Sequence, residues 1–186
     1  MEVRKAKAMF DFDGVITGSD VVSSVKKYKD AMSFYKTTDE SLDEDTIMYR
    51  VYQYTQGEGK SGNLNWGLTV MEPVRVAGEC NITRGHWHDN RDCAEFYMGV
   101  AGKGLLMYMD DEGNTWAEEV TKGSLHHIDG RLAHRLINTG EEVFKVACCW
   151  PCDAGHDYAA VEAQPFGYRV MKKDKELTFE KTEVTR

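Results

Sequence analysis

Short segments in which apolar and polar positions alternate recur along most of the chain, and clusters of turn-forming residues separate them. Alternation every second residue is typical of β-strands with one buried face. Gly, Asp and Asn gather in the intervening clusters, which include residues 57–63, 110–114 and 139–142. The pattern predicts strands at residues 47–55, 64–71, 80–83, 94–100, 104–109, 115–120, 125–128, 133–138 and 143–150. Short strands at this spacing favour an all-β sandwich or barrel.

The first part of the chain has a different pattern. Residues 20–35 predict a short helix, because apolar side chains fall roughly on one helical face: Val21, Val22, Val25, Tyr28 and Met32. Residues 37–45 are polar and acidic, which predicts an exposed connection. A hairpin is expected around residues 172–175, followed by a fraying tail. We therefore expect an N-terminal extension at 1–45 that packs on the barrel, the barrel at 46–170, and a C-terminal strand and tail at 171–186.

Composition narrows the classes of partner. The chain has 186 residues, enough for one domain with a sizeable core, and its net charge of -8 does not attract nucleic acid or an anionic membrane. It has no apolar run of the length that an export signal or a membrane span needs. We therefore expect a cytoplasmic protein without nucleic-acid or membrane partners. Its five cysteines are then expected to be reduced thiols.

Gly85-His86-Trp87-His88 is the most informative tetrapeptide of the sequence. Residues two apart on a strand point to the same face, so His86 and His88 are expected to face inward together. Glu95 and His134 lie in two later predicted strands, and the four side chains form a mixed N/O set suited to a borderline divalent metal. The alternative is that the histidines are structural, as the neighbouring pair at 126–127 illustrates.

The order of these residues resembles the two sequence blocks of cupins. His86, His88 and Glu95 are followed by Gly102, and the second block has Gly123, His134 and Asn138. The resemblance implies a double-stranded β-helix, or jelly-roll barrel, with an N-terminal extension that contains a short helix. The gap between His88 and Glu95 is longer than in most cupins, and Asp129 and Arg131 stand where proline and glycine are usual.

A narrower resemblance accounts for the longer gap. Residues 83–88, 94–97, 133–135 and 151–158 are similar to the archaeal-type, cupin-fold glucose-6-phosphate isomerase family, in which that gap is the rule. The similarity extends over roughly residues 49–168, and the run Asp-Ala-Gly-His-Asp-Tyr at 153–158 is its most specific piece. Trp150 stands where the family often has a tyrosine.

The resemblance implies a metal-dependent aldose–ketose isomerase that interconverts glucose 6-phosphate and fructose 6-phosphate. It also implies a cytoplasmic homodimer that serves glycolysis and gluconeogenesis. One divalent metal per subunit is expected at His86, His88, Glu95 and His134. Iron(II) is the first choice, with manganese, zinc or nickel as alternatives, because a His/Glu site selects poorly among them.

The resemblance also suggests which residues bind the phosphorylated hexose. Tyr49, Thr69, Thr83 and Gly85 match family positions for the phosphate, and His156 and Tyr158 lie in the closing motif. Tyr97 shares the face of Glu95 and has a hydroxyl for the sugar. Glu95 is a candidate base as well as a ligand, and His156 a candidate for ring opening. A cis-enediol route with a base and a direct hydride shift both remain open.

Other readings of the sequence have less support. A cupin dioxygenase has the same metal ligands but does not need phosphate contacts, and a sugar-binding cupin need not keep all four ligands. Asp11 and Asp13 resemble the nucleophile motif of haloacid-dehalogenase-type phosphatases, but that fold needs a parallel sheet with alternating helices. Cys149 and Cys152 form a Cys-x-x-Cys pair that closes a strand rather than opening a helix, so dithiol chemistry is not expected.

Overall fold

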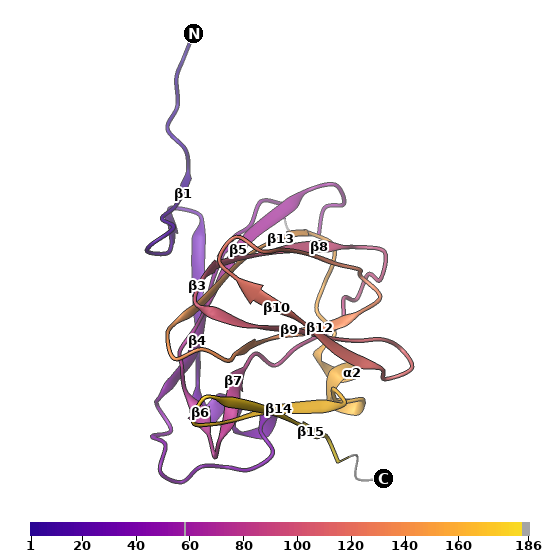
Figure 1. Ribbon diagram of the computed structural model, residues 1–186. Coiled ribbons are helices and arrows are strands. Elements are labelled where there is room, and N and C mark those ends of the chain that lie inside the picture. The colour runs from indigo at the N-terminus through magenta and orange to yellow at the C-terminus, as the bar shows by residue number, and fades with distance from the viewer. Residues whose placement is uncertain (58, 184–186) are drawn as a thin grey trace.

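Two antiparallel sheets face each other in the computed structural model, which describes residues 1–57 and 59–183 (Figure 1). One sheet has six strands in the order β11 (Leu125–Ile128), β8 (Glu95–Ala101), β13 (Phe144–Pro151), β5 (Leu64–Met71), β4 (Ile47–Tyr54) and β3 (Val21–Lys27). The other runs β10 (Thr115–Thr121), β9 (Lys103–Met109), β12 (Ala133–Asn138), β7 (Glu79–Ile82), β14 (Tyr168–Lys173) and β15 (Glu176–Lys181), with β6 (Arg75–Val76) paired to β7.

The remaining elements are short. β1 (Ala8–Phe10) and β2 (Ile16–Gly18) form a separate hairpin. Two short helices, α1 (Tyr28–Ala31) and the 3₁₀ helix η1 (Met32–Phe34), follow β3, and α2 (Tyr158–Ala163) follows β13. Neither α1 nor α2, the α-helices of the described residues, has the length and apolar character needed to cross a membrane.

The all-β prediction is confirmed. Each of the nine predicted strands coincides with an observed strand to within one residue at either end, and β14 and β15 form the predicted C-terminal hairpin. The connection at 37–45 is mostly exposed, as expected. Residue 58, in the first predicted turn cluster, and residues 184–186 of the predicted tail lie outside the described residues.

The helix predicted over residues 20–35 is wrong for its first half. Residues 21–27 form β3, which pairs along β4 from Val21 opposite Tyr54 to Lys27 opposite Ile47. Only residues 28–31 are α-helical. The three valines of this segment are β-branched and suit a strand, and the ladder to β4 is a long-range contact that outweighs local periodicity.

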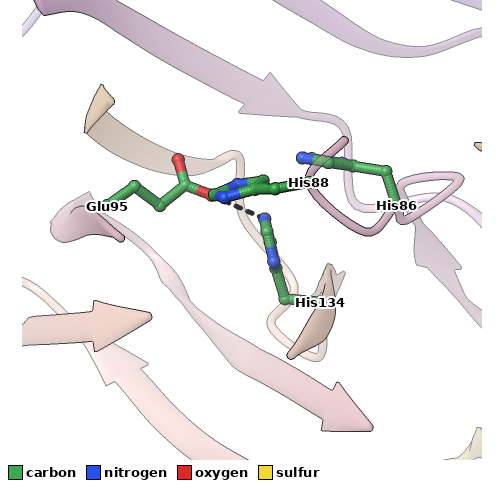
Figure 2. Close-up of side chains that lie close together, drawn as sticks. All are labelled: His86, His88, Glu95 and His134. Atoms are coloured by element: carbon green, nitrogen blue, oxygen red, sulfur yellow. Dashed lines mark hydrogen bonds and ion pairs between the residues drawn. The ribbon is translucent and has the colours of Figure 1, made fainter. Parts of the chain in front are cut away.

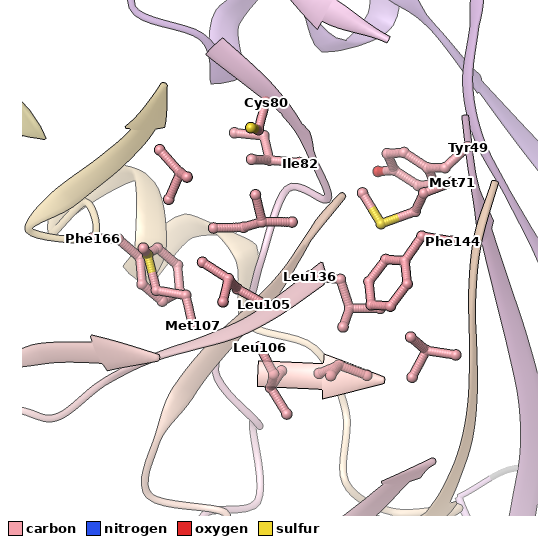
Figure 3. Packing of buried hydrophobic residues seen from close by; sticks show 14 of the residues in the cluster. Tyr49, Met71, Cys80, Ile82, Leu105, Leu106, Met107, Leu136, Phe144 and Phe166 are labelled. Carbon is pink, nitrogen blue, oxygen red and sulfur yellow. The ribbon is translucent and has the colours of Figure 1, made fainter. Parts of the chain in front are cut away.

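The hydrophobic core lies between the two sheets (Figure 3). Met71 and Phe144 come from the six-stranded sheet, and Leu106 and Leu136 from the other, all almost fully buried. Buried Asn138, the asparagine of the second cupin-like block, links the sheets: its Nδ2 donates to the carbonyl of Met71 at 3.1 Å. The amide therefore has a structural role between the two sheets.

The N-terminal hairpin covers the outer face of the six-stranded sheet. Ile16 is buried against Leu68, Val70 and Ala147, and Lys145 Nζ donates to the backbone carbonyls of residues 13 and 14. This confirms the strand–turn interpretation of the segment with Asp11 and Asp13. All sheet pairings of the described residues are antiparallel, so the parallel sheet of a haloacid-dehalogenase-type phosphatase is not present there.

Candidate metal centre and substrate cavity

Four side chains converge between the sheets: His86, His88, Glu95 and His134 (Figure 2). Glu95 opens β8 and His134 lies in β12, one in each sheet. The segment with His86 and His88 is extended but irregular, and it is held by two backbone hydrogen bonds between His86 and His134, of 3.2 and 3.1 Å. Four candidate ligand atoms, one from each residue, lie within 4.8 Å of one another.

Hydrogen bonds orient two of the imidazoles toward the centre. His88 Nδ1 donates to the carbonyl of Cys93 at 2.6 Å, and His134 Nδ1 lies 3.3 Å from the carbonyl of Leu132. With the proton on Nδ1, the lone pair of each Nε2 is directed at the centre. Histidines that bind metals are usually held in this way.

Glu95 Oε1 lies 3.1 Å from His88 Nε2 and 2.7 Å from His134 Nε2. The second contact lacks hydrogen-bond geometry, so the buried Nε2 of His134 has no hydrogen-bond partner within 1–57 and 59–183. A buried donor or acceptor without a partner is costly, and a cation shared by the four ligands would satisfy it. The residues present therefore fit a divalent metal.

The protonation states also suit a metal site. Burial, together with the neighbouring His134, His156 and His88, lowers the pKa of His86 well below its usual value, so its imidazole is neutral. Burial opposes ionisation of Glu95, but the electrostatic effect of the neighbouring His134 and His88 outweighs it and lowers its pKa to about 2. A neutral imidazole and an ionised carboxylate are the forms that bind metals.

A cavity of about 300 Å³ opens beside the centre. His86 and Glu95 line it, whereas His88 and His134 are buried behind its wall. All eight residues predicted to touch substrate or take part in catalysis line this cavity: Tyr49, Thr69, Thr83, Gly85, Glu95, Tyr97, His156 and Tyr158. They come from β4, β5, β8, two loops and the start of α2, so the fold gathers them from distant parts of the chain. Their individual roles remain predictions.

The closing motif is tied to the metal segment through the backbone. Trp87 and Asp157 exchange two hydrogen bonds, of 3.2 and 2.8 Å. Asp89 Oδ2 accepts a hydrogen bond from the backbone N–H of His156 at 3.0 Å. The ring of His156 consequently lies 4.4 Å from that of His86, and the ring of Tyr158 stacks on the His156 ring.

Sequence reasoning missed the basic residues of the cavity. Lys26 and Arg84 both line it, and the Arg84 guanidinium lies 4.6 Å from the centre of the Tyr158 ring. Lys26 was missed because its segment was predicted to be a helix. Arg84 lies between two predicted phosphate contacts in the sequence, and that position was a usable signal.

Trp150 forms part of the cavity wall, as does Cys148. A Cβ atom on Gly67 would lie 2.8 Å from the Trp150 ring, so the glycine makes room for the indole. Tryptophan at this position thus has a packing role and a surface on the cavity.

All five cysteines are free thiols, including Cys93 and the pair Cys149 and Cys152.

Comparisons with known proteins agree on one family. The family model described as "Glucose-6-phosphate isomerase" matches residues 19–183. The glucose-6-phosphate isomerase of Thermococcus kodakarensis is 35% identical over 167 residues, which cover 88% of this chain and 87% of that protein. The glucose-6-phosphate isomerase of Pyrococcus abyssi is 34% identical over 172 residues, which cover 90% of this chain and 89% of that protein.

Two solved structures resemble the chain at lower sequence identity. An oxalate oxidase in complex with the substrate analogue glycolate is 13% identical with a TM-score of 0.46, over 78% of this chain and 58% of that one. A Bacillus subtilis oxalate decarboxylase is 18% identical with a TM-score of 0.45, over 59% of this chain and 26% of that one.

Proposed function

Since this chain belongs to the glucose-6-phosphate isomerase family, we propose that it interconverts glucose 6-phosphate and fructose 6-phosphate at the cavity described above. The observation that carries the proposal is the position of Glu95. This carboxylate belongs to the candidate metal group and also lines the cavity, so it can contact a metal and a sugar together.

Isomerisation moves one hydrogen between C1 and C2 of the sugar and exchanges the carbonyl and hydroxyl groups. A divalent ion at the four ligands supplies Lewis-acid polarisation of the sugar carbonyl. Glu95 Oε1 is engaged by two imidazoles, while its second oxygen lies away from them (Figure 2). We assign that oxygen to take the proton from C2 and return it to C1, while the hydroxyl proton passes from O2 to O1. The reaction then balances without another reagent.

His156 is assigned to ring opening. Burial, with a contribution from His88 and His134, lowers the pKa of His156, so the imidazole is neutral at neutral pH. A neutral imidazole accepts the proton of the anomeric hydroxyl and can pass it to the ring oxygen. Its position beside His86 supports this assignment.

The phosphate of the substrate is assigned to the opposite part of the cavity. The hydroxyls of Tyr49, Thr69 and Thr83 are candidate donors there. Lys26 and Arg84 add the positive charge that a dianionic phosphate needs in a protein of net charge -8. Tyr97 and Tyr158 are assigned to the sugar hydroxyls.

The base assignment is tested with Glu95→Gln. We expect the variant to keep part of its metal and to lose about 10²- to 10⁴-fold in kcat, the usual contribution of a general base. Metal content and kcat are measured on the same samples, and wild-type turnover in D₂O is followed for deuterium at C2 of glucose 6-phosphate.

Glu112→Gln, in the exposed turn before β10, is the control and should behave as the wild type. Full turnover by a metal-loaded Glu95→Gln protein, with no deuterium uptake by the wild type, would reject the base and favour the direct hydride shift.

Further proposals concern the metal and the assembly. We propose iron(II) as the native metal, with manganese, zinc and nickel as functional substitutes, to be tested by metal analysis after purification without added metal.

We also propose a cytoplasmic homodimer that serves glycolysis and gluconeogenesis. Phe96 and Leu125, exposed on neighbouring strands β8 and β11, support a dimer contact, and light scattering in solution tests it.

A further inference from the structure

A second cavity, of about 230 Å³, lies between η1, α2 and β14, on the other side of Arg84 from the substrate cavity. Figure 1 shows α2 beside the end of β14, where this cavity is found. Arg84, Arg135 and Arg169 line it, together with Phe166 and Thr182. Of the residues assigned to the substrate, Arg84 alone lines this cavity as well.

The three arginines differ in how their charge is balanced. Arg169 Nη1 lies 2.9 Å from Glu79 Oε1, and Arg84 is paired with Glu162. Arg135 has no carboxylate partner in the part of the chain that the structure describes. Its Nη2 donates to the carbonyl of Arg84 at 2.8 Å, and its guanidinium stacks 4.2 Å from the Phe166 ring.

Three residues that line this cavity also have a polar atom without a partner. The Nε atoms of Arg84 and Arg135 and the Oγ1 of Thr182 are buried and make no hydrogen bond within the described residues. Burial and the neighbouring Arg169 lower the pKa of Arg135 only to about 10, so it stays charged at neutral pH. Stacking on Phe166 accounts for the packing of this side chain, but it leaves a buried positive charge and three unused polar atoms.

We propose that this cavity is a second anion site, which takes a phosphate or a small phosphate ester between Arg135, Arg84 and Thr182. A guanidinium presents parallel N–H donors that match the oxygens of a phosphate. The threonine hydroxyl adds a third donor from the segment after β15. An oxyanion there supplies the missing negative charge and the missing hydrogen-bond acceptors at once.

Equilibrium dialysis of the metal-loaded full chain against radiolabelled inorganic phosphate tests the proposal. The substrate cavity can hold a phosphate in both the wild type and Arg135→Gln. The wild type is therefore expected to bind one phosphate per chain more than the variant, at the second site. Arg131→Gln removes an exposed arginine four residues earlier, with 73% of its side chain exposed, and is expected to bind as the wild type does.

Thr182→Val keeps the shape of the side chain and removes only the hydroxyl. We expect it to weaken phosphate binding at this site about tenfold, the effect of losing one hydrogen bond to a charged group. Thermal unfolding shows whether Arg135→Gln is folded, since a folded protein unfolds cooperatively. If Arg135→Gln is not folded, Thr182→Val tests the proposal in its place. The same measurement with glycerol phosphate distinguishes the source: tighter Arg135-dependent binding of the ester favours a metabolite, and tighter binding of inorganic phosphate favours the free ion.

The proposal is overturned if neither Arg135→Gln nor Thr182→Val changes the number or affinity of bound phosphates. It is also overturned if Arg131→Gln loses as much binding as Arg135→Gln, since the effect would then come from net charge alone.

Discussion

Gly85 shows how tightly the metal segment is packed at the residue scale. Its φ of +77° lies in the left-handed region, which side chains with a Cβ disfavour. A Cβ atom there would lie 2.9 Å from the Phe166 ring and 3.1 Å from the carbonyl of His134. His86 follows directly, so a displaced backbone at Gly85 also moves a candidate ligand.

Gly85→Ala is therefore expected to lower the free energy of unfolding by about 2–4 kcal/mol, from backbone strain and the clash together. The KM for fructose 6-phosphate should rise, and the metal should bind less tightly. Urea unfolding, KM and metal affinity are measured together.

Gly123→Ala separates the two causes. Its φ is +89°, but nothing lies within 4 Å of an added Cβ, so only the strain of about 1 kcal/mol is expected. If both variants lose the same stability and both keep wild-type metal affinity, the packing at Gly85 does not support the metal centre.

Individual site residues were predictable to different degrees. His86 and His88 were found by their spacing, and Glu95 and His134 by their places in predicted strands. Lys26 and Arg84 were not found, because their closeness to the cavity depends on β3 lying along β4 and on the turn at Gly85. Asp89 was also missed: its role of holding the His156 loop is a contact between loops 67 residues apart.

Elements with one buried face were predictable, and those held by their surroundings were not. Period-two alternation identified the strands on both sides of the core, since most of them have an apolar face toward it. β10 was also predicted, although Val120 is its only buried residue. β3 lies at the edge of its sheet with most of its side chains exposed, so its hydrophobic pattern does not reveal its conformation. The β1–β2 hairpin also depends on its surroundings. Its strand and turn were predicted, but Ile16 is buried only because it packs on the outer face of β5 and β13.

Ile16→Ala tests the contribution of this hairpin. Ile16 is 3% exposed, so removing its side-chain atoms should cost about 2–4 kcal/mol of unfolding free energy. The substitution is on the outer face of the sheet, away from the substrate cavity, so kcat and KM should not change. Urea unfolding and steady-state kinetics provide both values.

Val22→Ala is the matched control, because Val22 lies in β3 and is 58% exposed. This substitution should lower the free energy of unfolding by less than about 0.5 kcal/mol. Equal losses from the two substitutions would mean that the hairpin does not pack on the sheet as described.

At the scale of the whole molecule, the metal-free protein should depend on pH through its buried histidines. The pKa of His86 and that of His156 are lowered by burial, so below about pH 6.5 the unfolded chain binds protons that the native one does not. Stability should therefore fall as the pH decreases below about 6.5. Burial lowers the pKa of His88, but Glu95 outweighs this effect and raises that pKa. His88 alone would therefore make the protein more stable as the pH decreases, and His86 and His156 together are expected to outweigh this one group.

Urea unfolding of the chelator-treated protein at about pH 7.5 and about pH 5.5 measures this difference. His86→Gln removes one of the two groups and should reduce the dependence. A stability that rises toward about pH 5.5 would contradict the neutral state assigned to these imidazoles.

The barrel as a whole brings together residues from both sheets, with Glu95 on one and His134 on the other. The proposed function requires a metal between them and the isomerisation of a hexose phosphate beside it. The most direct measurement is the conversion of fructose 6-phosphate to glucose 6-phosphate before chelation, after chelation, and with each divalent metal restored. We predict activity that disappears with the chelator and returns with iron(II) and with some of its substitutes. A folded, metal-loaded protein that gives no conversion with any metal would contradict the account, and oxygen consumption would then test the dioxygenase alternative.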